Sequence, residues 1–226
     1  MFDTEDFGWC DRSILAPEPS VDITFLTSDR YYVGDPNDPL QLSDPNCYVS
    51  LARAALTDMI SVSDLRENEA DLAFYYRDII EREVSINRTF EQFSHYFWMR
   101  LQFSWTWGGF LFPWYDSWSD MEPLLTWMAV AEDGAEWFDI EQGWEMQICL
   151  RAGQFHLRQG DGEGDEQLNI KIDRDTILKS TETAKKNCVH VIGELSRYLG
   201  TDVWTRRTYR QRVVFGTDAW SPYNKT

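Results

Sequence analysis

Histidine is scarce in this chain, and its cysteines are far apart. The histidines are His95, His156 and His190. The cysteines are Cys10, Cys47, Cys149 and Cys188. No histidine stands beside a serine, cysteine or carboxylate in a known catalytic motif, and no two cysteines have the spacing of metal ligands or of a redox dithiol. A nucleophile and its base would have to be assembled entirely by the fold, so the sequence indicates no catalytic residue, no metal site and no cofactor.

Long apolar runs and phosphate-binding loops are also missing. No hydrophobic stretch reaches the roughly 18 residues that a membrane-spanning helix needs. Trp107-Gly108-Gly109-Phe110 is not followed by the lysine or the helix start of a phosphate loop. Residues 1–6 are acidic where a secretory signal would be basic and then apolar. These absences predict a cytoplasmic protein with reduced thiols and no membrane contact.

Negative charge, in contrast, is present in large excess. The 226 residues include 38 Asp and Glu against 21 Lys and Arg, which gives a formal net charge of −17. Such a field repels nucleic acid and anionic membranes, and it attracts proteins with a basic surface in a salt-dependent way. The basic residues of the tail are Arg206, Arg207, Arg210, Arg212 and Lys225. We expect the tail to pair with acidic surface of the chain itself.

The length predicts a single domain over residues 1–226. Its expected parts are a loop-rich acidic segment (1–50), a helical and aromatic segment (66–133), a meander with a closing helix (135–200) and a basic tail (201–226). Within the first segment, prolines predict loops and consecutive turns at 35–39, and one strand is expected over 21–26.

Two helices are expected next. Apolar residues at three- and four-residue steps predict a helix over 66–84, with Glu81 and Glu83 on an acidic surface. Phe90, Phe93, Phe97 and Leu101 repeat that spacing, and Asn87 or Thr89 is the candidate cap. The pattern alternates beyond Arg100, which indicates that the second helix gives way to a strand.

The second half of the chain predicts an α+β fold. Residues 104–118 fit neither period, so we expect an aromatic loop there, followed by a helix from Ser119 to about Asp133. Alternating apolar and polar residues predict an antiparallel β-meander over 138–172, with a turn at Ala152-Gly153. A long helix should begin at Asp173 or Asp175 and end at Gly200. A meander packed against several helices is an α+β fold, not a βαβ fold.

Acidic and aromatic side chains are the candidate partner-binding residues, because carboxylates steer a basic partner and aromatic rings supply contact area. The candidates are Asp161, Glu163, Asp165, Glu166, Glu136, Trp137, Glu141, Trp144, Trp114, Tyr115 and Trp118. Acids at every second position of 160–166 are also typical of a calcium loop, but the twelve-residue pattern is missing. For most of these residues a solvated surface or an ordinary core position is the simpler interpretation.

The block from Asp120 to Gly200 resembles immunity proteins of bacterial polymorphic toxin systems. The likeness lies in the helix followed by a meander, in the segment from Trp137 to Trp144, in the hairpin through Phe155 to Arg158 and in the closing helix. It implies a cytosolic inhibitor that binds and occludes a cognate basic toxin. Two alternatives remain open: a nucleic-acid mimic that inhibits a DNA-binding protein, and an enzyme with a carboxylate site assembled by the fold.

Overall fold

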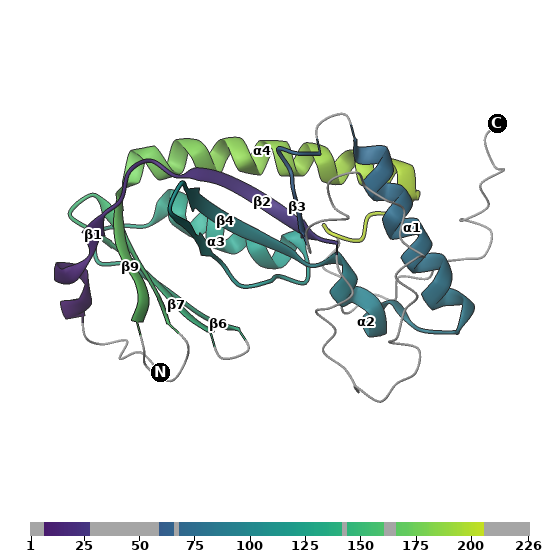
Figure 1. The fold of residues 1–226 in the computed structure, drawn as a ribbon, viewed down its shortest axis with the longest axis horizontal. Helices are drawn as coiled ribbons and strands as arrows, with labels where there is room; N and C mark the ends of the chain where they lie inside the picture. The colour runs from purple at the N-terminus through teal and green to yellow at the C-terminus, as the bar shows by residue number, and fades with distance from the viewer. Residues whose placement is uncertain (1–6, 28–58, 66–67, 142–143, 161–165, 206–226) are drawn as a thin grey trace. The chain divides into compact units, whose positions relative to one another are not determined.

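A computed structural model describes residues 7–27, 59–65, 68–141, 144–160 and 166–205 (Figure 1). The turns expected at 35–39 and the tail from Arg206 lie outside these ranges. Where the sequence predicts one domain, the contacts divide the chain into two compact units. Unit 1 comprises Met1–Ile23, Arg100–Tyr115 and Met121–Lys186, and unit 2 comprises Thr24–Met99, Asp116–Asp120 and Asn187–Thr226. Each unit is therefore assembled from segments that are distant in the sequence.

A five-stranded sheet forms the frame of unit 1 (Figure 1). Its strands are β1 (Ile14–Leu15), β6 (Glu136–Glu141), β7 (Trp144–Arg151), β8 (Gln154–Gly160) and β9 (Glu166–Asp173), in the order β1-β9-β8-β7-β6. The last four are antiparallel neighbours, which confirms the predicted meander, and β1 is parallel to β9. Ala152 and Gly153 both have positive φ, 51° and 73°, as a tight type I′ hairpin turn requires.

One face of this sheet is apolar and carries helices. Phe155 is paired with Leu150 on one side and with Ile172 on the other, and all three are buried. Trp127 of α3 (Trp118–Val130) contacts Phe155, with 6.1 Å between ring centroids. The sheet and its helices confirm the α+β fold class.

The long helix α4 (Arg174–Leu199) lies where the sequence predicts it. The backbone N–H of Thr176 donates to the Asp173 carboxylate at 3.0 Å, which caps the first turn. Gly200 follows the last turn with φ 72°, the left-handed conformation that ends many helices. The guanidinium of Arg174 donates to the Ala129 carbonyl at 3.2 Å and ties α4 to α3.

The aromatic loop expected at 104–118 is wrong in its first half. Strands β4 (Met99–Trp105) and β5 (Gly108–Leu111) form a hairpin there, with Phe103 paired to Phe110. A Cβ on Gly109 would lie 3.1 Å from the Phe103 carbonyl, so this glycine permits close strand pairing and does not mark a loop. The following helix, α3, begins one residue earlier than expected, at Trp118.

Unit 2 is built around helix α1 (Glu69–Ser85), in agreement with the helix predicted over 66–84. In this unit the end of β2 (Ser20–Leu26) pairs with β3 (Met59–Ser61), so the strand expected over 21–26 is also confirmed. The core centres on Trp204, which is fully buried. Its ring contacts Phe25, Tyr76 and Phe97, with centroids 5.3 to 5.8 Å apart. Its indole N–H donates to the Phe97 carbonyl at 3.1 Å.

The helix expected from Phe90 is shorter than predicted, but the strand expected to follow it near Arg100 is confirmed. Only α2 (Phe90–Phe93) and a 3-10 turn η5 (Ser94–Phe97) form before β4 begins at Met99. The alternating burial of β4 explains the early end, since this pattern suits a strand. Thr89 is the cap, and its N–H donates to the Gln92 side chain at 2.8 Å.

The expectation that Glu83 lies on an acidic surface is also wrong. Its side chain is buried. Arg82 and Arg88 approach the Glu83 carboxylate at 3.0 and 2.9 Å. These two guanidinium groups supply the charge and hydrogen bonds that a buried carboxylate needs.

Replacing Trp204 should strongly destabilise the protein. We expect Trp204→Ala to lower the free energy of unfolding by about 3–5 kcal/mol, because it leaves a cavity among three aromatic rings and an unpaired carbonyl. Chemical denaturation followed by circular dichroism measures this loss. Phe74→Ala is the matched control, since Phe74 is 53% exposed. Equal losses for both variants would contradict the assignment of Trp204 to the core.

Candidate functional site

The exposed surface of the described residues is acidic. Its exposed acids are Asp11, Glu18, Asp64, Asp71, Glu81, Glu91, Asp116, Asp120, Glu132, Asp133, Asp173, Asp175 and Glu182. Its exposed bases are Arg12, Arg151, Lys179, Lys186 and Arg197. The other basic side chains of the described residues are buried or half-buried. Arginine and lysine can cover apolar surface with their stems, so carboxylates dominate what faces water.

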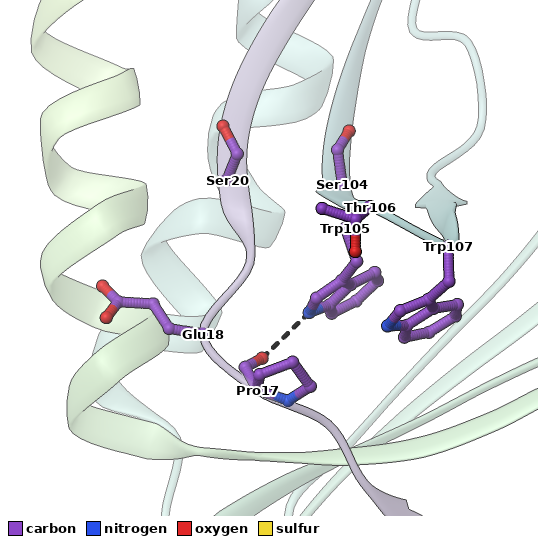
Figure 2. A pocket seen from close by; sticks show the side chains of 7 residues that line it. All are labelled: Pro17, Glu18, Ser20, Ser104, Trp105, Thr106 and Trp107. Atoms are coloured by element: carbon purple, nitrogen blue, oxygen red, sulfur yellow. Dashed lines mark hydrogen bonds between the residues drawn. The ribbon is translucent and has the colours of Figure 1, made fainter.

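A surface groove of about 450 Å³ lies in unit 1 (Figure 2). It is lined by Pro17, Glu18, Ser20, Ser104, Trp105, Thr106 and Trp107. The first three residues belong to the connection from β1 to β2 and to the start of β2. The other four form the end of β4 and the turn to β5. The β4–β5 hairpin thus presents its aromatic tip to the chain before β2.

Two stacked tryptophans form one wall of this groove. The rings of Trp105 and Trp107 are nearly parallel, at 10°, with centroids 4.9 Å apart. The indole N–H of Trp105 donates to the Pro17 carbonyl at 2.9 Å, as Figure 2 shows. Trp107 remains 56% exposed. One ring is therefore fixed by a hydrogen bond, and the second rests on it with much of its surface in water.

The polar groups of the groove are hydroxyls and one carboxylate. Ser20, Ser104 and Thr106 contribute the hydroxyls, and Glu18 is the charged residue of the lining. In Figure 2 the Glu18 side chain extends away from the indoles toward α4, where the Ser180 hydroxyl donates to it at 3.5 Å. The lining holds no histidine, cysteine or basic side chain. Such a surface is suited to binding and lacks a nucleophile–base pair.

Trp105 and Trp107 were not among the residues selected from the sequence. Their signal is the tripeptide Trp105-Thr106-Trp107 ahead of two glycines, because residues two apart at a hairpin end project to the same side. The selected aromatic residues Trp114, Tyr115 and Trp118 are instead buried. Arg100 covers the Trp114 ring at 4.2 Å, and the Tyr115 hydroxyl donates to Asp139 at 3.0 Å. These three rings belong to the core.

The structure describes only some of the candidate partner-binding acids and tryptophans of the meander. Glu136 and Trp137 are half-buried on β6. The Gln147 amide donates to the Glu136 carboxylate at 2.8 Å, and the Trp137 ring lies 5.7 Å from that of Trp127. Glu141 ends β6, Trp144 begins β7 and Glu166 begins β9. Asp161, Glu163 and Asp165 lie outside the described residues. Their role in partner binding stays a prediction.

A buried polar cluster covers the second face of the sheet in unit 1. The Ser13 hydroxyl donates to the Asn169 carbonyl oxygen at 2.6 Å and lies 3.1 Å from His156 Nδ1. Because Asn169 Oδ1 takes the single hydroxyl hydrogen of Ser13, the His156 tautomer with a proton on Nδ1 completes the second contact. Burial, with Lys171 and Arg151 nearby, lowers the pKa of His156, which favours the neutral ring. The arrangement is structural.

Two thiols and an arginine complete this face. Cys149 packs with Trp9 and Cys10 of η1 (Phe7–Arg12), and all three side chains are buried. Burial raises the pKa of Cys10 and raises that of Cys149 to about 12, so neither thiol is an activated nucleophile. Arg158 lies 4.8 Å from the Trp9 ring centroid, and its Nε donates to the side-chain oxygen Oε1 of Gln147 at 2.9 Å. Its charge is thus covered by a ring and an amide.

The two remaining histidines do not form a catalytic pair. Burial, together with the Arg88 guanidinium, lowers the pKa of His95 to about 4. The His95 ring packs against Tyr96 at 4.2 Å, and His190 is exposed on α4. Both positions fit ordinary packing or surface roles.

The described residues contain no candidate metal site and no candidate membrane-spanning helix. No group of three or more histidine, cysteine or acidic side chains there could hold a metal ion. Within the same ranges, no helix combines the length and the apolar character that crossing a membrane requires. In comparisons with known proteins, no family model, no curated protein and no solved structure matches the chain.

The lowered pKa of His95 predicts a loss of stability in acid. Between the ordinary pKa of 6.5 and about 4, the unfolded chain binds a proton at His95 that the folded chain does not bind. Stability should therefore fall as the pH drops below 6.5, by about 1–2 kcal/mol at pH 5. Urea denaturation of the wild type and of His95→Gln at neutral and acidic pH measures how much of the loss of stability in acid is due to His95. His190→Gln should keep the full loss, and an equal loss in His95→Gln would contradict the prediction.

The raised pKa of Cys149 predicts that its thiol reacts slowly with alkylating reagents. Relative to a thiol with the reference pKa of 9.0, a pKa of about 12 lowers the thiolate fraction at mildly alkaline pH by about a thousandfold. We expect native Cys149 to be alkylated by iodoacetamide at least that much more slowly than the same residue in urea. Mass spectrometry of the Cys149 peptide over time measures both rates. Similar rates in the two states would show that this thiol is accessible and activated.

Proposed function

We propose that this chain is an acidic binding protein that neutralises a basic protein toxin by occluding its working surface. The observation that carries the proposal is the imbalance of exposed charge. Exposed acids far outnumber exposed bases among the described residues, and they occur in both units. The formal net charge of −17 extends this imbalance to the whole chain.

Binding of this kind requires no chemistry from the chain. A negative field raises the rate of encounter with a basic surface, and exposed aromatic rings supply contact area once the two proteins meet. The groove with Trp105 and Trp107 offers such rings. The serine, histidines and cysteines discussed above have structural or surface roles that are compatible with an inhibitor. The resemblance of residues 120–200 to immunity proteins of toxin systems supports the same function.

Association with the partner should depend on salt. We expect a basic toxin encoded next to the gene of this chain to bind it with an association rate constant that falls roughly tenfold or more between about 50 mM and about 500 mM NaCl. The dissociation rate constant should change much less, because short-range contacts determine it. Surface plasmon resonance with the purified partner measures both.

Two controls separate electrostatic steering from ion-specific effects and from chemical modification of the toxin. Potassium glutamate at matched ionic strength should act like NaCl if screening is the cause. Co-expression with the toxin should restore cell growth without chemical change to the toxin, as intact mass spectrometry can verify. Association that is insensitive to salt, or turnover of the toxin by this chain, would contradict the proposal.

A further inference from the structure

We propose that the groove lined by the Trp105–Trp107 pair receives an arginine side chain of the basic partner. The inference rests on the proposed function, and it assigns a ligand to one surface of the protein. Trp107 is the anchor, because it is 56% exposed at a hairpin tip, where a partner can reach it. Among the exposed large apolar residues that the structure describes in unit 1, it is the aromatic one.

The tryptophan pair is organised before any ligand arrives. Trp105 is held by its hydrogen bond to the Pro17 carbonyl, and Trp107 stacks on it almost in parallel. A guanidinium laid on Trp107 would meet a ring that is already oriented. Binding to a preorganised surface costs less side-chain entropy than ordering a free side chain. Figure 2 shows both rings on the same side of the groove, opposite the chain that enters β2.

The charge of the lining favours a cation. Its charged residue is Glu18, which is exposed and whose side chain extends from the edge of the groove toward α4, and the described residues of the lining include no base. The hydroxyls of Ser20, Ser104 and Thr106 can accept hydrogen bonds from a guanidinium, which carries five N–H donors. A cation at this place would also be drawn by the net charge of the whole chain.

Arginine is favoured over lysine for two reasons. A planar, weakly hydrated guanidinium stacks on an indole and still donates hydrogen bonds in its plane, whereas an ammonium is a compact and strongly hydrated charge. Among the described residues, two arginines lie over indole rings. Arg158 lies 4.8 Å from the centroid of Trp9, and Arg100 lies 4.2 Å from that of Trp114. In both cases the ring is buried, so Trp107 is the exposed equivalent.

A defined peptide tests the site without the natural partner. We expect an Arg-Gly repeat peptide of about ten residues to shift the indole N–H resonances of Trp105 and Trp107 in ¹⁵N-labelled protein. A Lys-Gly peptide of equal charge should cause smaller shifts at the same concentration. Assignment uses Trp105→Phe and Trp107→Phe. Absence of shifts with the arginine peptide would overturn the inference, as would equal shifts with lysine or larger shifts with a neutral oligosaccharide.

Variants then test the site against the protein partner. Trp107→Ala should weaken binding roughly 3- to 30-fold, the range expected for loss of one cation–π contact, and Trp107→Phe should recover part of it. Phe74→Ala removes a side chain of nearly equal exposure, 53%, outside the groove and should leave affinity unchanged. Glu18→Gln should weaken binding more than Glu132→Gln, which removes an exposed charge elsewhere. Circular dichroism verifies that each variant is folded.

The outcomes separate this inference from the proposed function. If the partner binds with salt-dependent kinetics and Trp107→Ala binds like the wild type, the groove is not the arginine site, and the proposed function stands. If the partner does not bind the wild type at all, the proposed function fails, and the assignment of this groove to the partner fails with it.

Discussion

The cost of removing a carboxylate from water governs the arrangement of this chain. A buried carboxylate without a partner is too expensive to retain, so an acidic sequence has to keep most of its acids at the surface. The exposed side chains of both units follow this rule. Among the described residues Glu83 and Glu145 are the buried carboxylates, and the oxygens of Glu83 are paired with Arg82 and Arg88. The result is a strongly negative exterior, and the proposed recognition of a basic partner follows from it.

The same constraint applies to polar groups inside unit 1. The second face of the sheet carries serine, histidine, asparagine, glutamine and arginine side chains, and η1 contributes Trp9 and Cys10 against them. Hydrogen bonds among Ser13, His156 and Asn169, and between Arg158 and Gln147, offset the loss of water. Groups that resemble catalytic residues by type are therefore occupied in holding the sheet and η1 together. The contacts of Ser13 and His156 thus serve the packing of η1 against the sheet.

Aromatic residues have two separate roles in this molecule. Most of them fill cores, as around Trp204 in unit 2 and around Phe155 in unit 1. Trp107 differs because a tight hairpin places it in the turn between β4 and β5, where it is 56% exposed. Its neighbour Trp105 is tied to the Pro17 carbonyl, which belongs to a segment 88 residues away in the sequence. The groove therefore depends on tertiary structure, although its most exposed ring is set by a local turn.

The sequence by itself determined the elements whose signals are periodic and long. The α1 and α4 helices, the meander and the turn at Ala152-Gly153 follow from spacing, caps and alternation, which are local properties of the backbone and side chains. It failed at Gly108-Gly109, where the glycines allow close strand pairing, and it placed the change from helix to strand after Phe97 slightly too late. Only the tertiary structure decided that Trp114, Tyr115 and Trp118 are buried while Trp107 is exposed, and that Pro17 and Glu18 lie beside it. Burial is fixed by contacts between distant segments, and a list of residues in order contains no such contacts.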